Sequence, residues 1–464
     1  MLKRTHGWRH LFLAILLCLL ALAPLGHVEA RPVTASVSAA DLAPFLKAKI
    51  NWRQAAGQTI NVGLTDEFDT DVLHKQLPIF EALTGITVKW AKYMDVTQKL
   101  TVDFASHAGT IDVGHIDSMY IPEDAESKYI EPIDKYLNDP KLTDPKWFNY
   151  NDLVPAFRDL GKWNGVTYAL PEYIETSLVL YRKDLAQKAG ITKAPATWQD
   201  FADDCRRMNQ PPKVYGCAFD ALKGSDQNVY RWTMVARAFG GNFFKDYPKD
   251  LTPVLNSPQN VAATQWYATT LQKYAPPGVA NWGWYEVDSA GQQGKIAMEF
   301  ESYDTALVLD DKSVSKTAGK WGVWPIPHGP GGTWPSAFSW LTAINAYSHH
   351  KVAAWLFMEF ANSYASQVLK TTDQPFTDRT SIWSNNTIMA KWKGQDHGEW
   401  LPVVNQMFKV ARADFRPRFT GWGQFGDRLS LAIQAAVAGK SAKAELDAAQ
   451  QDALTMLRQG GYIQ

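Results

Sequence analysis

The sequence predicts an α/β protein made of two lobes. Strand-like and helix-like segments alternate from residue 60 onward, which is typical of folds built on a parallel sheet. The chain has 464 residues, and the 434 that follow a predicted leader are too many for one compact core. Hydrophobic residues at 46% and charged residues at 20% indicate a globular protein.

The first thirty residues are predicted to be a signal peptide. Three basic residues precede an apolar run from Leu11 to Leu22, and Ala30 supplies the small residue that a signal peptidase needs. The apolar run is shorter than the ~20 residues of a membrane-spanning helix. Cys18 follows a bulky leucine, so we expect no lipid attachment there. A mature chain beginning at Arg31 would be a soluble secreted or periplasmic protein.

The predicted mature chain is almost neutral. Cleavage removes three basic residues and one acidic residue, which leaves 44 basic and 46 acidic side chains. This balance argues against nucleic acid or an anionic membrane surface as a partner.

The opening unit reads strand, helix, strand. Ile60 to Leu64 forms the first strand and Ile86 to Trp90 the second, with apolar residues at helical spacing between them. Gly85 is expected to end the helix. Pro78 conflicts with a continuous helix, so the regular part is expected to begin near Leu77.

Periodicity predicts further elements along the chain. Thr197, followed three positions later by Asp200, is expected to cap a helix, and Gly439 separates two C-terminal helices of which Ser441 caps the second. The other predicted segments are helix 98–106, strand 111–116, a strand from 166 that ends at Pro171, strand 177–181, helix 261–274, strand 295–300, helix 352–360 and the C-terminal pair within 427–458.

Two cysteines remain after cleavage. Cys205 and Cys217 lie twelve positions apart, and in an exported chain they most simply form one disulfide. The alternative is a pair of buried thiols, because Cys205 lies on the apolar stripe of a predicted helix. No histidine stands at ligand spacing near either cysteine, so we expect no metal site.

Most enzymatic signatures are missing from the sequence. The chain contains neither GxSxG nor HExxH. Gly421 to Gly426 matches GxGxxG, but the preceding Arg416-Pro417-Arg418 is not a buried strand, so we expect no dinucleotide and no other cofactor. Glu299 and Glu301 share one face of a predicted strand and could act as acid and base in glycoside hydrolysis. A hydrogen-bonded strand edge is the simpler interpretation of that pair.

The aromatic content points to a hydroxyl-rich ligand. The chain has 19 tryptophans, many of them near predicted strand ends and loops. Sugar and polyol C–H groups lie against indole faces, while carboxylates, arginines and amides bind the hydroxyls. Any single tryptophan is still more simply explained as a core residue.

Several segments resemble the solute-binding proteins of carbohydrate ABC importers, the group that includes maltose-binding protein. The resemblance covers residues 58 to 458, and the agreement with the sugar-alcohol and short-sugar branch is greatest. The segments that carry it are Phe80–Val88, Ile111–Val113, Tyr129–Asp134, Tyr168–Tyr173, Leu180–Leu185, Ala189-Gly190, Pro195–Trp198, Gly240-Gly241, Leu255–Pro258, Gly294–Met298 and Ala353–Phe357.

This resemblance implies a two-lobed periplasmic-binding-protein fold of the α/β class, with three hinge crossings and the ligand in the cleft between the lobes. Lobe one would be residues 31–168 plus 338–380, and lobe two residues 169–337 plus 381–464. The crossings are expected near Leu170-Pro171, near Ser336–Ser339 and near Pro375–Arg379.

The resemblance also implies which residues contact the ligand. They are Asp66, Glu67, Asp117, Ser118, Glu172 and Tyr173 from lobe one and the first crossing; Arg231, Trp232, Tyr303, Asp304 and Trp422 from lobe two; and Trp340 and Arg379 at the other crossings.

We therefore expect a monomeric periplasmic protein that captures a sugar or polyol by hinge closure and delivers it to the membrane subunits of an ABC permease. An exported glycoside hydrolase using Glu299 and Glu301 is the first alternative. A phosphorylated polyol or a polyamine as the ligand of the same fold is the second. A phosphate would require clustered basic side chains, and a polyamine would require carboxylates without basic partners.

Overall fold

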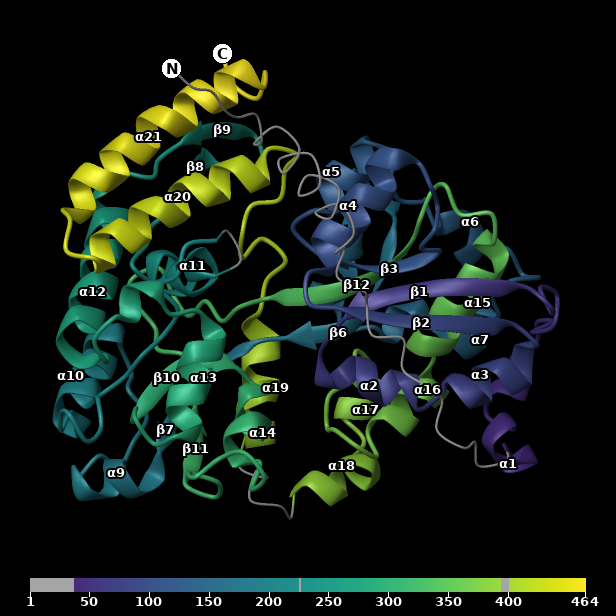
Figure 1. Ribbon diagram of the computed structural model, residues 1–464, viewed down its shortest axis with the longest axis horizontal. Coiled ribbons are helices and arrows are strands. Elements are labelled where there is room, and N and C mark those ends of the chain that lie inside the picture. Colours follow the sequence, from purple (N-terminus) through teal and green to yellow (C-terminus); the bar gives the residue numbers. More distant parts are fainter. Residues whose placement is uncertain (1–36, 225–226, 394–399) are drawn as a thin grey trace, which may run out of the picture.

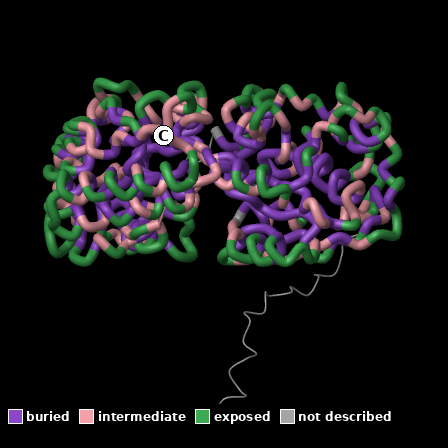
Figure 2. Tube along the Cα trace, turned by 90° about the horizontal axis from the view of Figure 1, so that it is seen from above, coloured by how far each residue is buried: buried purple, intermediate pink, exposed green. Residues whose placement is uncertain are grey.

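The computed structural model describes residues 37–224, 227–393 and 400–464. Its elements gather into two rounded bodies joined by a narrow connection (Figures 1 and 2). Each body has its own sheet, as the two-lobed α/β prediction requires. The predicted signal peptide lies outside the described residues.

The first lobe is built on a five-stranded sheet of order β2-β1-β3-β12-β6. Strands β1 (Thr59–Thr65), β2 (Thr87–Tyr93) and β3 (Val113–Asp117) are parallel, whereas β12 (Phe338–Ile344) runs antiparallel to β3 and to β6 (Ala169–Glu175). Helix α15 (Lys351–Asn362) packs on this sheet, and its Phe357 meets Phe80 of α3 (Leu77–Thr84) edge-on at 5.4 Å.

The helix between the first two strands is divided, as Pro78 predicted. Helix α2 (Phe68–His74) ends before α3, which begins at Leu77 and carries Pro78 in its first turn, where a missing N–H costs no hydrogen bond. Gly85 then ends α3 in the left-handed conformation, with φ of 72°.

The prediction that a strand ends at Pro171 was wrong. Strand β6 runs through Pro171 to Glu175. The strand lies at the edge of its sheet, where a missing N–H is tolerated, and the register shifts so that Trp340 pairs with Tyr173 while Leu341 pairs with Pro171. Glu172 is the extra residue of this bulge.

The second lobe has an antiparallel sheet of order β10-β7-β11, formed by β10 (Met298–Ser302), β7 (Ser177–Arg182) and β11 (Trp321–Trp324). Its helices include α11 (Asn228–Ala238), α12 (Pro258–Tyr274) and the C-terminal pair α20 (Trp422–Val437) and α21 (Ala442–Gln459), which pack together (Figure 1). As predicted, Ser441 caps α21.

The remaining helices and strands complete both bodies. They are α1 (Ala39–Leu42), η1 (Phe45–Lys47), α4 (Val96–Ser106), α5 (Ile121–Glu126), α6 (Asp134–Leu137), α7 (Pro145–Phe148), η2 (Tyr150–Asp152), α8 (Pro155–Arg158), η3 (Asp159–Gly161), β4 (Lys162–Trp163), β5 (Val166–Thr167), α9 (Lys183–Lys188), α10 (Trp198–Met208), β8 (Phe244–Asp246), β9 (Asp250–Pro253), η4 (Val279–Asn281), α13 (Trp284–Gln292), α14 (Thr305–Asp310), α16 (Tyr364–Lys370), α17 (Thr380–Trp383), α18 (Asn386–Lys393) and α19 (Trp400–Val410).

The chain passes between the sheets at three places. Residue 176 separates β6 in the first sheet from β7 in the second, and the segment between β11 and β12 returns to the first sheet. After α16 the chain continues through α17 and α18 and reaches the second sheet with α19, which contacts β7 and β11.

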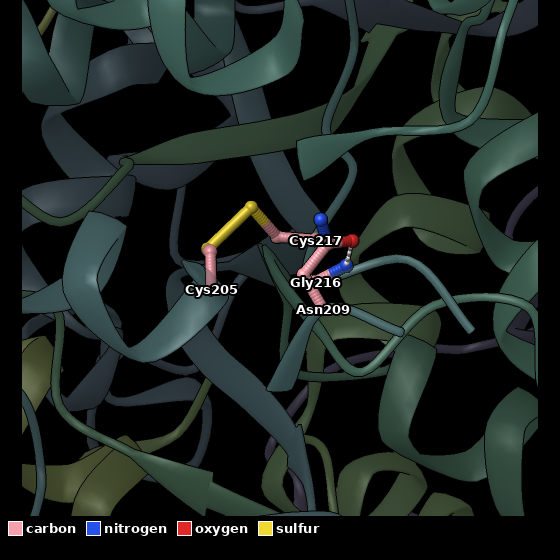
Figure 3. Close-up of a disulfide and its surroundings, with 4 residues drawn as sticks. All are labelled: Cys205, Asn209, Gly216 and Cys217. Atoms are coloured by element: carbon pink, nitrogen blue, oxygen red, sulfur yellow. Dashed lines mark hydrogen bonds between the residues drawn. A yellow bond between two sulfur atoms is a disulfide. The ribbon is translucent and has the colours of Figure 1, made fainter. Parts of the chain in front are cut away.

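Cys205 and Cys217 form a disulfide, with their Cα atoms 5.4 Å apart (Figure 3). Thr197 and Asp200 cap α10 reciprocally, as predicted, and Cys205 is buried on this helix. The Gly216 N–H donates to Asn209 Oδ1 at 3.0 Å. A side chain at Gly216 would collide with the Cys205 carbonyl oxygen, since a Cβ there would lie 2.0 Å from it. Glycine therefore permits the close approach of the two segments.

Among the described helices, none combines the length and apolar character needed to cross a bilayer.

Candidate functional site

A cavity of about 600 Å³ lies between the two sheets. On the first-lobe side its lining includes the ends of parallel strands β1 and β3, where open α/β sheets bind ligands. On the second-lobe side it includes the end of β10 and the helices α11, α13 and α14. Side chains from both lobes therefore face one shared space.

Asp66 and Glu67 follow strand β1, Asp117 is the last residue of β3, and all three line the cavity. Asp66 forms an ion pair at 2.8 Å with Lys92, which also pairs with Asp71 at 2.6 Å. Asp117 accepts the Met119 N–H at 2.8 Å.

Trp340 contacts both Glu67 and His115. Its indole Nε1 donates to Glu67 Oε1 at 3.1 Å, and its ring stacks on His115 with centroids 5.8 Å apart and planes 10° apart. Burial, reinforced by the charge of Asp304, raises the pKa of Glu67 to about 8. Glu67 can therefore act as donor or acceptor near neutral pH.

A cluster of hydroxyls and carboxyls joins the first crossing to the second lobe. The Tyr173 hydroxyl donates to Asp304 Oδ2 at 2.7 Å and lies 3.3 Å from Glu175 Oε2. The Tyr230 hydroxyl donates to Glu175 Oε1 at 2.6 Å. Burial, followed by the charge of Asp304, raises the pKa of Glu175 to about 7.

Helix α11 presents one face to the cavity. Gln227 just precedes the helix, and Tyr230 and Arg231 follow it three and four positions later, the spacing of neighbours on one helical face. Arg231 forms ion pairs with Asp220, at 3.4 Å, and with Glu301. Its charge is therefore compensated by two buried carboxylates.

Aromatic rings form part of the wall. Phe338 lies edge-on to Trp340 at 5.4 Å and to Tyr230 at 6.0 Å. Trp284 and Tyr285 stack at 3.5 Å at the start of α13, and Tyr285 is 52% exposed. Such rings can cover the C–H faces of a polyhydroxylated ligand while the carboxyls and arginines bind its hydroxyls.

Seven of the residues expected at the site line this cavity and six do not. Those in the lining are Asp66, Glu67, Asp117, Tyr173, Arg231, Asp304 and Trp340, and those outside it are Ser118, Glu172, Trp232, Tyr303, Arg379 and Trp422.

Glu172 and Ser118 are buried and do not line the cavity. Glu172 is the extra residue of the bulge in β6, and it is absent from the lining to which its neighbour Tyr173 belongs. Lys370 Nζ donates to both Glu172 Oε1 and its backbone carbonyl at 2.8 Å. Ser118 is buried, and its hydroxyl donates to Asp117 Oδ1 at 3.3 Å.

Trp232 and Trp422 are core residues of the second lobe. Trp232 follows Arg231 on α11, and the next residue of a helix points about 100° away, here toward Thr264, which accepts its Nε1 proton at 2.8 Å. Trp422 begins α20 and packs edge-on against Phe243 at 5.9 Å.

Tyr303 and Arg379 are buried and donate hydrogen bonds to backbone carbonyls instead of facing the cavity. The Tyr303 hydroxyl donates to the Ile174 carbonyl, and its ring lies 4.2 Å from that of Phe376. Arg379 is buried and donates to the carbonyl oxygens of Phe148, at 2.7 Å, and Asn149, at 2.8 Å, among others.

Several lining residues were not identified from the sequence. Two signals could have found some of them: the i, i+3, i+4 face that contains Arg231, and the strand alternation that pairs Tyr173 with Glu175. Arg416, which precedes the GxGxxG segment, has no such signal. The missed residues include Glu175, Asp220, Gln227, Tyr230, Trp284, Asp288, Phe338 and Arg416.

The pair proposed for hydrolysis is not assembled at the cavity. Glu301 belongs to the lining and is bound by Arg231, whereas Glu299 lies outside it, fully buried, with both carboxyl oxygens lacking a hydrogen-bond partner. Burial raises the pKa of Glu299 well above its usual value.

Comparisons with known proteins agree on one family. A family model described as bacterial extracellular solute-binding protein matches residues 58–368. A mannitol-binding protein of Pseudomonas aeruginosa is 28% identical over 66% of this chain and 70% of its own length. An erythritol/L-threitol-binding protein of Mycolicibacterium smegmatis is 25% identical over 79% of this chain and 80% of its own.

Solved structures share the fold. An ABC transporter solute-binding protein from Agrobacterium radiobacter, in complex with ribitol, superposes with a TM-score of 0.76 at 26% identity and covers 87% of this chain and 99% of that one. A solute-binding protein from Agrobacterium vitis with bound D-mannitol gives a TM-score of 0.74 at 24% identity over the same shares of both chains.

Proposed function

Because this chain belongs to the bacterial extracellular solute-binding proteins, we propose that it captures a sugar or polyol and delivers it to the permease of an ABC importer. The family resemblance expected from the sequence is confirmed by the family match. Two relatives are named for polyols, and two structural neighbours hold a bound polyol. These polyols favour a sugar alcohol as the ligand.

The observation that carries this proposal is the cavity shared by the two lobes. Its size falls within the usual range of ligand pockets, and it combines aromatic rings with carboxyls, amides and arginines. Hydroxyl groups both donate and accept hydrogen bonds. The ion-paired Arg231, Asp220 and Glu301 would orient hydroxyls from one lobe, while Trp340 and Asp66 would contact the ligand from the other.

Hinge closure follows from this arrangement. A ligand that contacts both lobes binds the closed form more tightly than the open form, so it shifts the population toward closure. The three passages of the chain between the sheets are the proposed hinge. The boundary expected after residue 168 would place β6 in lobe two, but β6 pairs with β12 in the first sheet. We therefore assign residues 31–175 plus 338–380 to lobe one and residues 176–337 plus 381–464 to lobe two.

The proposed ligand contacts are the seven expected residues that line the cavity, together with Glu175, Gln227, Tyr230 and Phe338. We propose that the protein acts as a periplasmic monomer after cleavage behind Ala30, with permease subunits as its partners and without nucleic acid. Binding would occur without chemical change of the ligand.

Isothermal titration calorimetry of the mature chain tests this proposal. A panel of tetritols, pentitols, hexitols and short sugars should include at least one ligand that binds one to one. Chromatography of the recovered ligand should show it unchanged. Absence of binding across the panel would refute the proposal, and appearance of a cleaved product would favour the hydrolase alternative.

A further inference from the structure

The charges in the cavity are unevenly compensated. Arg231 is shared by Asp220 and Glu301, and Lys92 is shared by Asp66 and Asp71, so each cation faces two carboxylates. Glu67, Glu175 and Asp304, which also line the cavity, form no ion pair with any lysine, arginine or histidine among the described residues. The cavity therefore carries more carboxyls than paired cations, and we call the group formed by Glu67, Glu175 and Asp304 its acidic end.

The acidic end brings together residues from both lobes. Tyr173 hydroxyl contacts join Glu175 and Asp304, and the charges of Asp304 and Glu175 act on Glu67. Each carboxyl is bonded only to neutral groups in the described structure: Glu67 to Trp340, Glu175 to Tyr173 and Tyr230, and Asp304 to Tyr173 and its own helix start. These partners carry no positive charge, and the charge of Arg231 only partly opposes the rise in the pKa of Glu175.

A fourth carboxyl adds to this end of the cavity. Asp288 of α13 lines the same space, is 7% exposed, and its Oδ1 has no hydrogen-bond partner. Burial, followed by the charge of Asp304, raises the pKa of Asp288 well above its usual value, and the charge of Arg231 opposes this rise. A buried acceptor without a partner is costly unless a bound group satisfies it.

Aromatic rings lie beside these carboxyls. Trp340 and Phe338 meet edge-on, and Tyr173 lies among the carboxyls themselves. The Tyr230 ring is already contacted by the guanidinium groups of Arg231, at 4.8 Å, and Arg416, at 4.9 Å, so Trp340 and Phe338 are the rings left for a ligand cation. Ring faces attract a cation through their quadrupole, and carboxylates provide its hydrogen-bond acceptors. Together they form the chemical surroundings that bind an ammonium group.

We propose that the ligand is an amine-bearing polyol or sugar, whose ammonium group lies among Glu67, Glu175 and Asp304 while its hydroxyls face Arg231, Asp220 and Gln227. This inference rests on the proposed function and narrows its ligand class. A neutral ligand would leave the acidic end either uncompensated or protonated. An ammonium group compensates it directly and donates up to three hydrogen bonds.

Matched ligand pairs test the inference by calorimetry at pH 8. The pairs are sorbitol with 1-amino-1-deoxysorbitol, and glucose with glucosamine, which differ by one amine in place of one hydroxyl. We expect the amine of at least one pair to bind at least tenfold more tightly than its neutral partner. If no amine binds more tightly than its neutral partner, the inference is overturned, while binding of any neutral polyol or sugar leaves the proposed function standing.

Variants locate the ammonium group. Asp304→Asn and Glu175→Gln should each reduce the ratio of amine to neutral affinity at least fivefold, because each removes one charge of the acidic end. The ratio is taken within one variant, so partial loss of folded protein does not alter it. Asp203→Asn, an exposed residue of α10 paired with Arg206, should keep the wild-type ratio. An unchanged ratio in both cavity variants would contradict the assignment, and failure of every amine, sugar and polyol to bind would refute both proposals.

Discussion

Replacing Trp340 with alanine should weaken ligand binding about 70-fold. Trp340 provides two interactions in the proposed complex: an indole face toward the cavity and the Nε1 hydrogen bond that orients Glu67. If the ligand covers about 60 Å² of the ring, loss of that contact costs about 1.5 kcal/mol at 25 cal/mol per Å². Loss of the hydrogen bond adds about 1 kcal/mol. The sum of about 2.5 kcal/mol corresponds to that factor in Kd.

Two further variants separate these contributions. Trp340→Phe keeps an aromatic face but removes the N–H donor, so binding should weaken only about fivefold. Trp324→Ala removes a tryptophan of β11 that stacks on Tyr181 at 3.4 Å and lies outside the cavity lining, and it should leave Kd unchanged. Calorimetry supplies Kd, and circular dichroism confirms that each variant is folded. A folded Trp340→Ala protein that binds within threefold of wild type would refute the placement of the ligand against this ring.

Three other predictions concern residues away from the ligand. Reducing the Cys205–Cys217 disulfide should lower the free energy of unfolding by about 3 kcal/mol, seen as a lower melting temperature in dithiothreitol; an unchanged melting temperature would contradict this. Arg379→Met should cost about 3 kcal/mol or more of stability in denaturant titrations yet leave Kd within threefold, because Arg379 bonds backbone carbonyls outside the cavity; a large loss of affinity would instead make it a ligand contact. Burial raises the pKa of Glu359 well above 4.5, so the folded state holds a proton that the unfolded chain releases, and stability falls as pH rises above about 4.5. Glu359→Met should add about 1–3 kcal/mol at pH 7 and reduce that fall, whereas a destabilised variant would show that Glu359 has a stabilising partner.

Local sequence signals predicted the secondary structure well where a single glycine or proline fixes the backbone conformation. Gly85 ended α3 because glycine adopts the left-handed conformation at low cost, and Pro78 marked the start of that helix. The same reasoning failed at Pro171. Its effect on a strand depends on whether the strand lies at a sheet edge, and that position is set by tertiary pairing with β12.

The candidate site was predictable to the level of the segment rather than the residue. The family resemblance placed Asp66, Glu67 and Asp304 at the cavity, and all three belong to its lining. For Asp66 and Glu67 the physical reason is that parallel strands such as β1 end at one edge of a sheet. Within each segment, the side chain that reaches the cavity depends on strand or helix phase. Glu172, at the bulge of β6, and Trp232, one residue along α11, each neighbour a lining residue and do not line the cavity themselves.

Contacts between residues far apart in the chain explain the remaining differences between the expected and the observed site residues. Arg379 was expected to bind ligand, and its guanidinium instead satisfies carbonyls more than two hundred residues away in the chain, such as that of Phe148. Arg416 reaches the cavity from a loop without regular structure. Neither arrangement leaves a periodic pattern in the sequence.

A crystal structure of the mature chain with the tightest-binding member of the sugar, polyol and amine panel tests the central claim most directly. The claim predicts ligand density in the cavity, in contact with Trp340 or Asp66 on one side and with Tyr230 or Arg231 on the other. Density confined to one lobe, or bound away from the cavity altogether, would contradict it.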